Sequence, residues 1–456
     1  MTGGGLMQLV AYGAQDVYLT ANPQVTFFKQ LYRRHSNFAM EAIEQTFNGV
    51  ANFGKRVQCT IARNGDLITR VYVQATLPAL DDTDLTGATE FQWVPFVGQF
   101  LINSVEVEIG GQRIDKQYGD WLHIWNELTL PVGKGRDYLE MVNGPGGVVY
   151  KDFDACDACT EYAPIRCANA DLASKGTDCA LLDCSGLADA SGCVPEQTLY
   201  IPLEFWFNRH TGLALPLIAL QYHEVKINIE FNEARSLFSV GALDTAADRS
   251  AVATAINRKG LVACSLYVDY IYLDTEERRR FAQVAHEYLI EQLQYTGEET
   301  VTSSQNKIQM NFNHPVKELI WVVQSPSYTD CNEICQKPYL YADSQGNNPV
   351  AVAKVQLNGH DRFTEREGKY FNRVQPYQHH SASPSTGINV YSFALKPEDL
   401  QPSGSCNFSR IDNAVLNLTL TKGTFDGNSS AAVRIYAVNY NVLRIMSGMG
   451  GLAYSN

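Results

Sequence analysis

Hydrophobic and polar residues alternate along several short segments, as they do in strands that bury one face. In the segment 103–109, Val105, Val107 and Ile109 fall on one face and the polar residues on the other. Such segments are separated by the turn sequences Asn64-Gly65-Asp66, Gly110-Gly111, Asn358-Gly359 and Asp426-Gly427. The pattern predicts an all-β chain with short helices and long surface loops.

Helical patterns are rare along the chain. The best candidate is the segment 275–293, where Thr275 is a suitable cap and Glu276 and Glu277 suit the first turn of a helix. An extended linker is equally compatible with this segment. The Ala-rich polar stretch 241–259 is expected to be a long loop.

The first residues predict an arm rather than part of a core. Residues 1–24 begin with the flexible sequence Thr2-Gly3-Gly4-Gly5 and end just after Asn22-Pro23. The following segment 25–32 is apolar and aromatic, and could anchor the arm.

The chain also resembles itself. When Asp66 is aligned with His314, an offset of 248 positions, the apolar segment 66–73 aligns with 314–321. The same offset aligns 107–113 with 355–361, and in both cases a strand pattern runs into a Gly-containing tight turn. A constant offset over two separate units is difficult to explain by chance.

The second half of the repeat is unequal in length. Residues 265–274 align with 434–443, so the offset falls to 169 and the first copy is the longer one. The two copies predict two tandem β-sandwich domains of similar topology, at 25–280 and 281–456, behind the arm.

Composition and charge narrow the possible functions. The 456 residues are too many for one ordinary core, and the formal net charge is −13. An acidic surface repels phosphates, so no direct nucleic-acid binding is expected. No apolar run reaches the roughly 18 residues that span a bilayer, and Met1–Val10 lacks the basic and apolar regions of a signal peptide.

The residue pairs and clusters that could support catalysis or bind a metal do not complete a known motif. His223-Glu224 and His286-Glu287 lack the second His of a zinc-protease motif, and the pair His379-His380 would point to opposite faces of a strand. The residues Asp81, Asp82 and Asp84 lack the Gly and Glu that complete a calcium loop. We therefore predict no enzyme activity, no catalytic residues, no cofactor-binding residues and no metal site.

Six of the 11 cysteines fall in one window, which consists of Cys156, Cys159, Cys167, Cys179, Cys184 and Cys193. Cys156 and Cys159 form a CxxC, but no second CxxC follows, as a zinc ribbon would require. Disulfides, free thiols and a metal site all remain open for this window, in decreasing order of preference. Cys331 and Cys335 form a smaller pair with the same ambiguity.

Eight segments resemble the major capsid proteins of nucleocytoplasmic large DNA viruses, in the branch that infects algae and amoebae. They are LVAYGAQDVYLTANPQVTFFKQLYRRHSNFA (9–39), NGDLITRVYV (64–73), EIGGQRIDKQYGDW (108–121), GLALPLIALQYHEVKINI (212–229), YIYLDTEERRRFAQVAHEYLIEQLQYTG (270–297), LNGHDRFTEREGKYFNRVQPYQ (357–378), YSFALKPEDLQPSGSCNFSRIDNA (391–414) and YAVNYNVLRIMSGMGGLAYSN (436–456). They follow one another over most of the chain. The departure is the Cys-rich segment at about 151–198, which looks like an insertion and matches no motif of the family.

The resemblance implies a double jelly-roll: two eight-stranded jelly rolls in tandem. It also implies a homotrimer that forms a pseudo-hexagonal capsomer in the icosahedral shell of a large dsDNA virus. The expected partners are the chain itself, neighbouring capsomers, minor capsid and penton proteins, and internal membrane proteins. The expected location is the virion capsid shell, after synthesis and assembly in the host cell cytoplasm.

Two other functions are compatible with β-sandwiches. Jelly rolls also build carbohydrate-binding and adhesion proteins, and this is the alternative reading of the sequence. A cupin-type enzyme would need a His-x-His with a spaced Glu, which the sequence lacks.

Overall fold

The computed structural model describes residues 3–81, 84, 90–131, 133–143, 182–183, 194–241, 246–329, 337–343, 345–424 and 430–454. The chain divides into two units, Met1–Phe38 and Ala39–Asn456. The first unit contains the helices α1 (Gly4–Val10) and α2 (Val17–Thr20), neither of which buries a residue. Phe27 and Phe28 of the expected anchor are 91% and 99% exposed. The described residues of this unit therefore form no hydrophobic core of their own.

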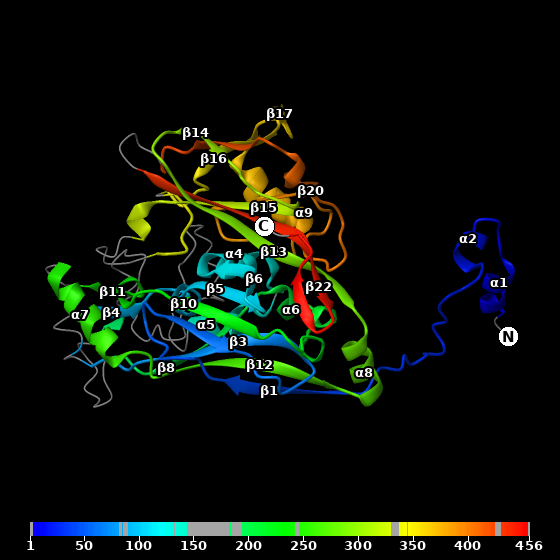
Figure 1. The fold of residues 1–456 in the computed structure, drawn as a ribbon. Coiled ribbons are helices and arrows are strands. Elements are labelled where there is room, and N and C mark those ends of the chain that lie inside the picture. Colours follow the sequence, from blue (N-terminus) through cyan, green and yellow to red (C-terminus); the bar gives the residue numbers. More distant parts are fainter. Residues whose placement is uncertain are drawn as a thin grey trace. The chain divides into compact units, whose positions relative to one another are not determined.

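In the second unit, the strands of the first half form two main antiparallel sheets (Figure 1). The first sheet has the order β1 (Phe38–Gln45), β12 (Ala263–Leu273), β3 (Leu67–Leu77), β8 (Gln197–Pro202), with β9 (Leu215–Pro216) also on β3. The second sheet has the order β2 (Arg56–Thr60), β10 (Val225–Phe231), β5 (Ile102–Ile109), β6 (Gln112–Tyr118). A small third sheet has the order β11 (Phe238–Gly241), β4 (Glu90–Trp93), β7 (Leu182–Asp183).

The strands of the second half form two further sheets. One has the order β13 (His286–Val301), β22 (Ala431–Met446), β15 (Pro315–Gln324), β19 (Ile388–Ser392), with β20 (Cys406–Asn407) on β15 and β23 (Met449–Leu452) on β22. The other has the order β14 (Gln305–Gln309), β21 (Ala414–Leu420), β16 (Val350–Leu357), β17 (His360–Asp361), with β18 (Arg366–Glu367) on β16.

The two halves repeat the same strand order. In each half, the first strand lies beside the last long strand, and the chain passes back and forth between the two sheets, with β5–β6 and β16–β17 as hairpins within one sheet, which is the jelly-roll arrangement. The sequence repeat falls on equivalent strands: β3 corresponds to β15, the β5–β6 hairpin to β16–β17, and β12 to β22. The prediction of two tandem jelly rolls is confirmed.

Helices and short helical turns connect the strands. They are α3 (Val97–Leu101), α4 (Gly119–Thr129), α5 (Gly135–Asn143), α6 (Trp206–Arg209), η3 (Thr211–Leu213), η4 (Leu217–Ala219), η5 (Ala234–Ser236), α7 (Ala246–Lys259), α8 (Thr275–Gln283), η6 (Pro326–Tyr328), η7 (Tyr370–Val374), α9 (Gln375–His379) and η8 (Phe408–Arg410). Among the described residues, no helix has the length and apolarity needed to cross a membrane.

Two expectations about helices need correction. The segment 241–259 is not a long loop, because Ala246–Lys259 forms α7: alanine favours helices, and Val252 and Ile256 lie on one buried face. The segment 275–293 is only partly helical, since α8 ends at Gln283 and β13 begins three residues later.

The cap of α8 also differs from the expected one. Asp274 is the N-cap, and its Oδ1 accepts a hydrogen bond of 2.7 Å from the backbone N–H of Thr275. Thr275, which the sequence suggested as the cap, is instead the first residue of the helix.

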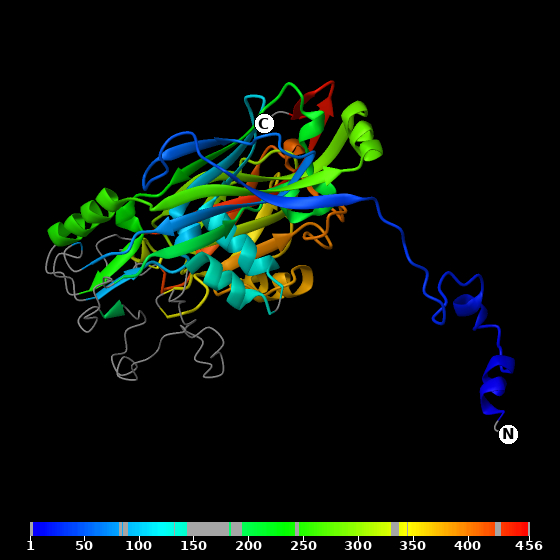
Figure 2. The same cartoon turned by 90° about the horizontal axis from the view of Figure 1, so that it is seen from below.

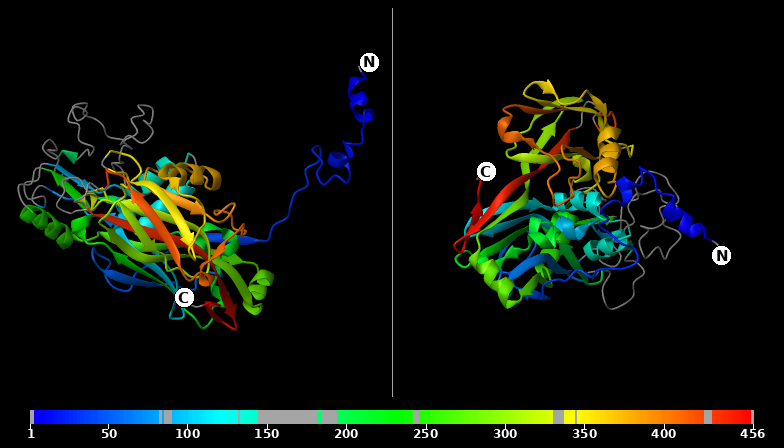
Figure 3. Two further views of the ribbon diagram at one scale, coloured as in Figure 1. Left: turned by 90° about the horizontal axis from the view of Figure 1, so that it is seen from above. Right: turned by 90° about the vertical axis from the view of Figure 1, so that its right-hand side faces the viewer.

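Each jelly roll buries its own hydrophobic core between its two sheets. In the first, Val71 and Val73 of β3 pack with Ile227 and Ile229 of β10. The second core is built in the same way and includes Trp321 of β15. Figures 2 and 3 show the layers of strands from other directions. The first core also includes Ile290 of β13 and Leu443 and Ile445 of β22, so the two jelly rolls already share apolar contacts there.

Candidate functional site

A third hydrophobic cluster joins the two jelly rolls. Helix α4, from the first jelly roll, contributes Trp121, Ile124, Trp125 and Leu128, and strands β15, β19 and β22 of the second contribute the facing residues. Trp121 has no exposed surface. We call this contact region the seam. Burying such large side chains there makes the two jelly rolls one packed body.

The start of α4 explains how the helix comes so close to its neighbours. Gly119 is its first residue, and a Cβ at this position would lie 2.4 Å from the backbone oxygen of Ile102 and 2.5 Å from that of Gln99. Only glycine fits such an approach. Further along α4, burial lowers the pKa of His123 to about 3, so this side chain is neutral and stacks on Tyr339 at 4.4 Å between ring centres.

Polar contacts also cross the seam. The backbone N–H of Leu293 in β13 donates to Asp115 Oδ1 of β6 at 3.1 Å, and Gln292 Nε2 donates to the backbone oxygen of Ile114. On another part of α4, Arg434 of β22 pairs with Asp120. In addition to the apolar packing, these bonds hold β13 against β6 and β22 against α4.

A charged cluster lies beside this contact. Arg209 of α6 stacks over the Trp125 ring at 3.9 Å, and its Nη1 lies 2.9 Å from Glu291 Oε2 of β13. The other oxygen of Glu291 lies 2.6 Å from Lys317 Nζ of β15, a side chain with no exposed surface. An unpaired charge in this buried region would cost free energy. Glu291 therefore pairs with two cations, Arg209 from the first jelly roll and Lys317 from the second.

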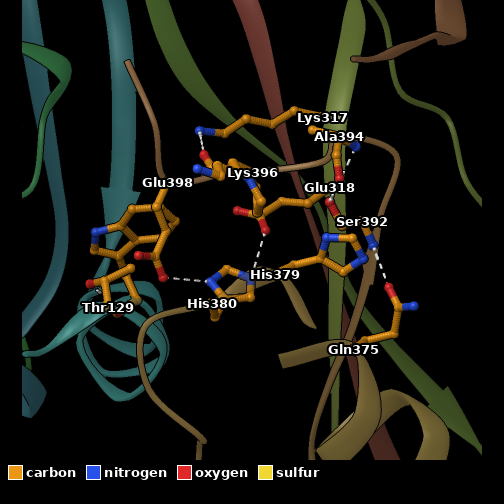
Figure 4. Close-up of polar contacts among 12 residues, drawn as sticks. Thr129, Lys317, Glu318, Gln375, His379, His380, Ser392, Ala394, Lys396 and Glu398 are labelled. Atoms are coloured by element: carbon orange, nitrogen blue, oxygen red, sulfur yellow. Dashed lines mark hydrogen bonds and ion pairs between the residues drawn. The ribbon is translucent and has the colours of Figure 1, made fainter. Parts of the chain in front are cut away.

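A second buried ion-pair cluster surrounds His380 (Figure 4). His380 Nε2 lies 3.0 Å from Glu318 Oε2 and its Nδ1 lies 2.9 Å from Glu398 Oε1; the side chains of His380 and Glu318 have no exposed surface. Burial alone would lower the pKa of His380, but the charge of Glu318 and hydrogen bonding to Glu398 raise it to about 9. His380 is therefore a cation at neutral pH.

The loop that follows His380 reaches across the seam. The N–H of Ala382 donates to the backbone oxygen of Leu128 at 3.0 Å, and the N–H of Ser385 donates to Glu127 Oε2 at 3.2 Å. Both acceptors belong to α4 of the first jelly roll. The ion pairs of His380 thus hold a loop of the second jelly roll against the first.

The histidines considered from the sequence have structural contacts. His223 Nδ1 lies 3.0 Å from the backbone oxygen of Gly450, His286 Nε2 lies 2.8 Å from that of Phe281, and His379 Nδ1 lies 3.0 Å from that of Leu395. His379 and His380 are not a strand pair, because α9 ends at His379. The expectation that these two histidines lie on a strand is therefore wrong, and the long-range carboxylate partners of His380 gave no signal in the sequence.

The acidic loop is partly described. Asp84 is only 2% exposed and lies 2.5 Å from Lys259 Nζ and 3.2 Å from Arg258 Nη2, both on α7. Asp81 also pairs with Lys259, at 3.6 Å, while Asp82 lies outside the described residues. Lys259 and Arg258 thus pair with the two described carboxylates of this loop, Asp81 and Asp84.

Cysteines give no metal site in the described residues. The window from Cys156 to Cys193, and Cys331 and Cys335, lie outside them. The structure has free thiols at Cys59, Cys264 and Cys406. Burial raises the pKa of Cys59 to about 11, so this thiol stays protonated at neutral pH. Within the described ranges, no three His, Cys, Asp or Glu side chains come together as a metal site.

Comparison with known proteins identifies the family. Residues 26–274 match the profile of the major capsid protein N-terminus, and residues 277–451 match that of the large eukaryotic DNA virus major capsid protein. The chain belongs to the major capsid proteins of large eukaryotic DNA viruses. This family consists of structural proteins and not enzymes, and the alternative of a carbohydrate-binding protein gains no support.

Individual capsid proteins of this family match over their whole length. The major capsid protein of Pyramimonas orientalis virus is 52% identical over all of both chains, and that of Phaeocystis pouchetii virus is 49% identical over 99% of this chain and all of the relative. A chain of the PBCV-1 virus capsid superposes with a TM-score of 0.70 at 36% identity, covering 94% of this chain and 100% of that one. The Faustovirus major capsid protein gives the same TM-score at 14% identity, which shows a shared fold.

Membership in a family of structural proteins indicates a structural role for the seam. In a structural protein, buried ion pairs such as Glu318–His380 are expected to hold one arrangement of the two jelly rolls. The charged groups of the His380 cluster are paired with one another, and the side chains of His380 and Glu318 have no exposed surface. Their geometry is that of a buried structural contact.

Proposed function

We propose that this chain forms homotrimers, and that the trimers act as pseudo-hexagonal capsomers that tile the icosahedral shell of a large dsDNA virus. Two similar jelly rolls in each chain support this proposal, because three copies together present six similar walls. Such a block fits the six-fold environment of an icosahedral facet. The rigid seam also supports it, since a tile must keep its two halves in one orientation.

The observation that carries the proposal is the whole-length family match combined with the repeated strand order of the two jelly rolls. A match to one jelly roll alone would leave the sixfold geometry without support. Subunits of such shells bury large surfaces, and we expect well over about 2,000 Å² for each trimer.

We propose three parts for the chain: an arm at 1–24, a first jelly roll at 25–280 with a Cys-rich insertion at about 151–198, and a second jelly roll at 281–456. The arm is proposed to lie on the inner side of the shell and to become ordered through its neighbours. The lack of any buried residue in α1 and α2 supports this role.

The proposed partners are the chain itself, neighbouring capsomers, minor capsid and penton proteins, and internal membrane proteins. The net charge of −13 argues against direct contact with the genome. The proposed route begins with synthesis and assembly in the host cytoplasm and ends in the virion shell.

The experiment that tests the proposal is quantitative mass analysis of purified particles. We expect this chain to be the most abundant protein of the particle, in a copy number divisible by three. A chain present in a few copies per particle, or absent from it, would show that it does not build the shell.

A further inference from the structure

The outer face of one sheet is built in the same way in both jelly rolls. On the β13–β22–β15–β19 sheet, Ile320 and Tyr436 are a cross-strand pair that packs with α4 in the seam. The sequence repeat makes Tyr72 and Tyr267 of the first jelly roll the equivalent residues, and they too are a cross-strand pair, with stacked rings 5.3 Å apart. The β1–β12–β3–β8 sheet therefore has a counterpart of the surface that α4 covers.

This counterpart is open where the seam is closed. Tyr72 and Tyr267 are only half-buried, whereas their equivalents in the second jelly roll are at most 1% exposed. Tyr200 of β8 lies 6.2 Å from the Tyr72 ring and is 39% exposed. By the strand registers its equivalent is Ile388 of β19, a seam residue with no exposed surface. We call the surface of these three tyrosines the tyrosine face.

The second jelly roll also has a counterpart of α4. Gly119 begins α4, and a Cβ there would overlap the backbone oxygen of the first residue of β5. Gly368, 249 positions later, meets the first residue of β16 in the same way, just before η7 and α9. At this offset Leu122 of α4 corresponds to Phe371 of η7, and each lies in the core of its own jelly roll. The two helical segments therefore sit on their sheets in the same orientation.

The outer sides of these two helical segments differ only in whether they are covered. Trp125 and Leu128 of α4 belong to the seam. Their counterparts are Val374 of η7, which is 39% exposed, and Tyr377 of α9, which is 83% exposed. Figure 1 shows α9 well separated from β3 and β12 of the same chain, so this helix does not cover the tyrosine face of its own molecule.

We propose that the outer side of η7 and α9 packs on the tyrosine face of a second copy of this chain. The contact rests on the proposed homotrimer and repeats between molecules the one that α4 makes within each. Three copies closed in a ring then contain six contacts of similar design. The ion pair of Arg434 with Asp120 is not repeated, because the equivalent positions hold Ser265 and Lys369. Apolar and aromatic packing therefore carries the contact between copies.

Photo-crosslinking of full-length trimers locates the contact. Benzoylphenylalanine takes the place of Tyr377, and trimers assembled from isotopically light and heavy chains identify the cross-links that join two copies. We expect these cross-links to reach peptides of β3, β8 and β12. The same group in place of Tyr222, which is 76% exposed between η4 and β10, is the control and should not reach these strands. Trimers without such cross-links from position 377 would overturn the inference and leave the homotrimer standing, whereas a wild-type protein without trimers would overturn both.

Charged substitutions measure how much the contact contributes. Tyr377→Asp and Tyr200→Lys each place an ionised group in an aromatic contact, where it loses its hydration. Both side chains are exposed in the single chain, so the fold itself should persist. In a dilution series followed by native mass spectrometry, we expect each variant to dissociate at a protein concentration at least about tenfold higher than wild type. Tyr222→Asp is the matched control, and the inference fails if either variant dissociates no more readily than this control.

Discussion

Removal of His380 is the sharpest perturbation of the seam. In His380→Ala, the carboxylate of Glu318 stays buried with no exposed surface but loses the imidazole 3.0 Å away. Glu398, which is 20% exposed, loses the same partner at 2.9 Å. The variant therefore creates an uncompensated charge in the interior and does not simply remove a contact.

The magnitude follows from the burial of the pair. Breaking a fully buried ion pair by deleting one partner costs about 3–5 kcal/mol of unfolding free energy. The double variant Glu318→Gln/His380→Gln leaves no buried charge in the pair, so it is expected to cost less than His380→Ala alone. His379→Ala is the matched control, because the one hydrogen bond described for this neighbouring imidazole goes to the backbone oxygen of Leu395 and is worth about 1 kcal/mol.

The contribution of His380 to the free energy of unfolding depends on pH. The pKa of His380 is raised from 6.5 to about 9, so its contribution is complete below about pH 6.5 and disappears as the pH rises towards 9. The charge of His380 lowers the pKa of Glu318, which burial would otherwise raise. Without His380, that carboxyl is expected to take up a proton more readily, so the deficit of the variant should shrink as the pH falls below 6.

Urea denaturation of capsomers at pH 5, 7 and 9 measures these differences. We expect the gap between wild type and His380→Ala to be greatest near pH 7 and smaller at pH 5 and at pH 9. The assignment of His380 as a buried cation would be refuted if His380→Ala lost no more unfolding free energy than His379→Ala. It would also be refuted if the loss did not change with pH.

Three further predictions concern other parts of the chain. Trp121→Ala removes the largest fully buried side chain of the seam cluster and is expected to cost about 3–5 kcal/mol in the same urea assay, whereas a cost below about 1 kcal/mol would show that the seam is not well packed. Deletion of residues 1–20 should leave trimers intact in size-exclusion chromatography but weaken shell assembly; loss of trimers would make the arm part of the fold. The window Cys156–Cys193 is expected to be an outward loop closed by disulfides, so thiol counting in denatured virions should find no free thiols there, and six thiols or one zinc per chain would contradict this.

The sequence predicted the jelly rolls well because their signals are local or repeated. Alternating residues such as Val105 and Val107 identify a strand without knowledge of its neighbours. The constant offset between 66–73 and 314–321 then placed two strands at equivalent positions, which the sheet order confirms. Helix α7 was missed because its polar residues resemble a loop, and its buried face contains few large apolar side chains.

The seam could not be predicted from the sequence. Its ion pairs join residues far apart in the chain, such as Arg209 with Glu291 and Asp120 with Arg434, and no local pattern indicates which charge lies opposite which. His380 was expected on a strand, because its burial depends on how a loop packs against β15, which the local sequence does not show. Packing between domains is decided by three-dimensional fit, which the periodicity of single elements does not encode.

The central claim is that this chain is a trimeric shell subunit, and native mass spectrometry of the purified protein tests it most directly. At micromolar concentration we expect one dominant species of about three times 50.7 kDa, with few free chains. A stable monomer at that concentration would contradict the claim.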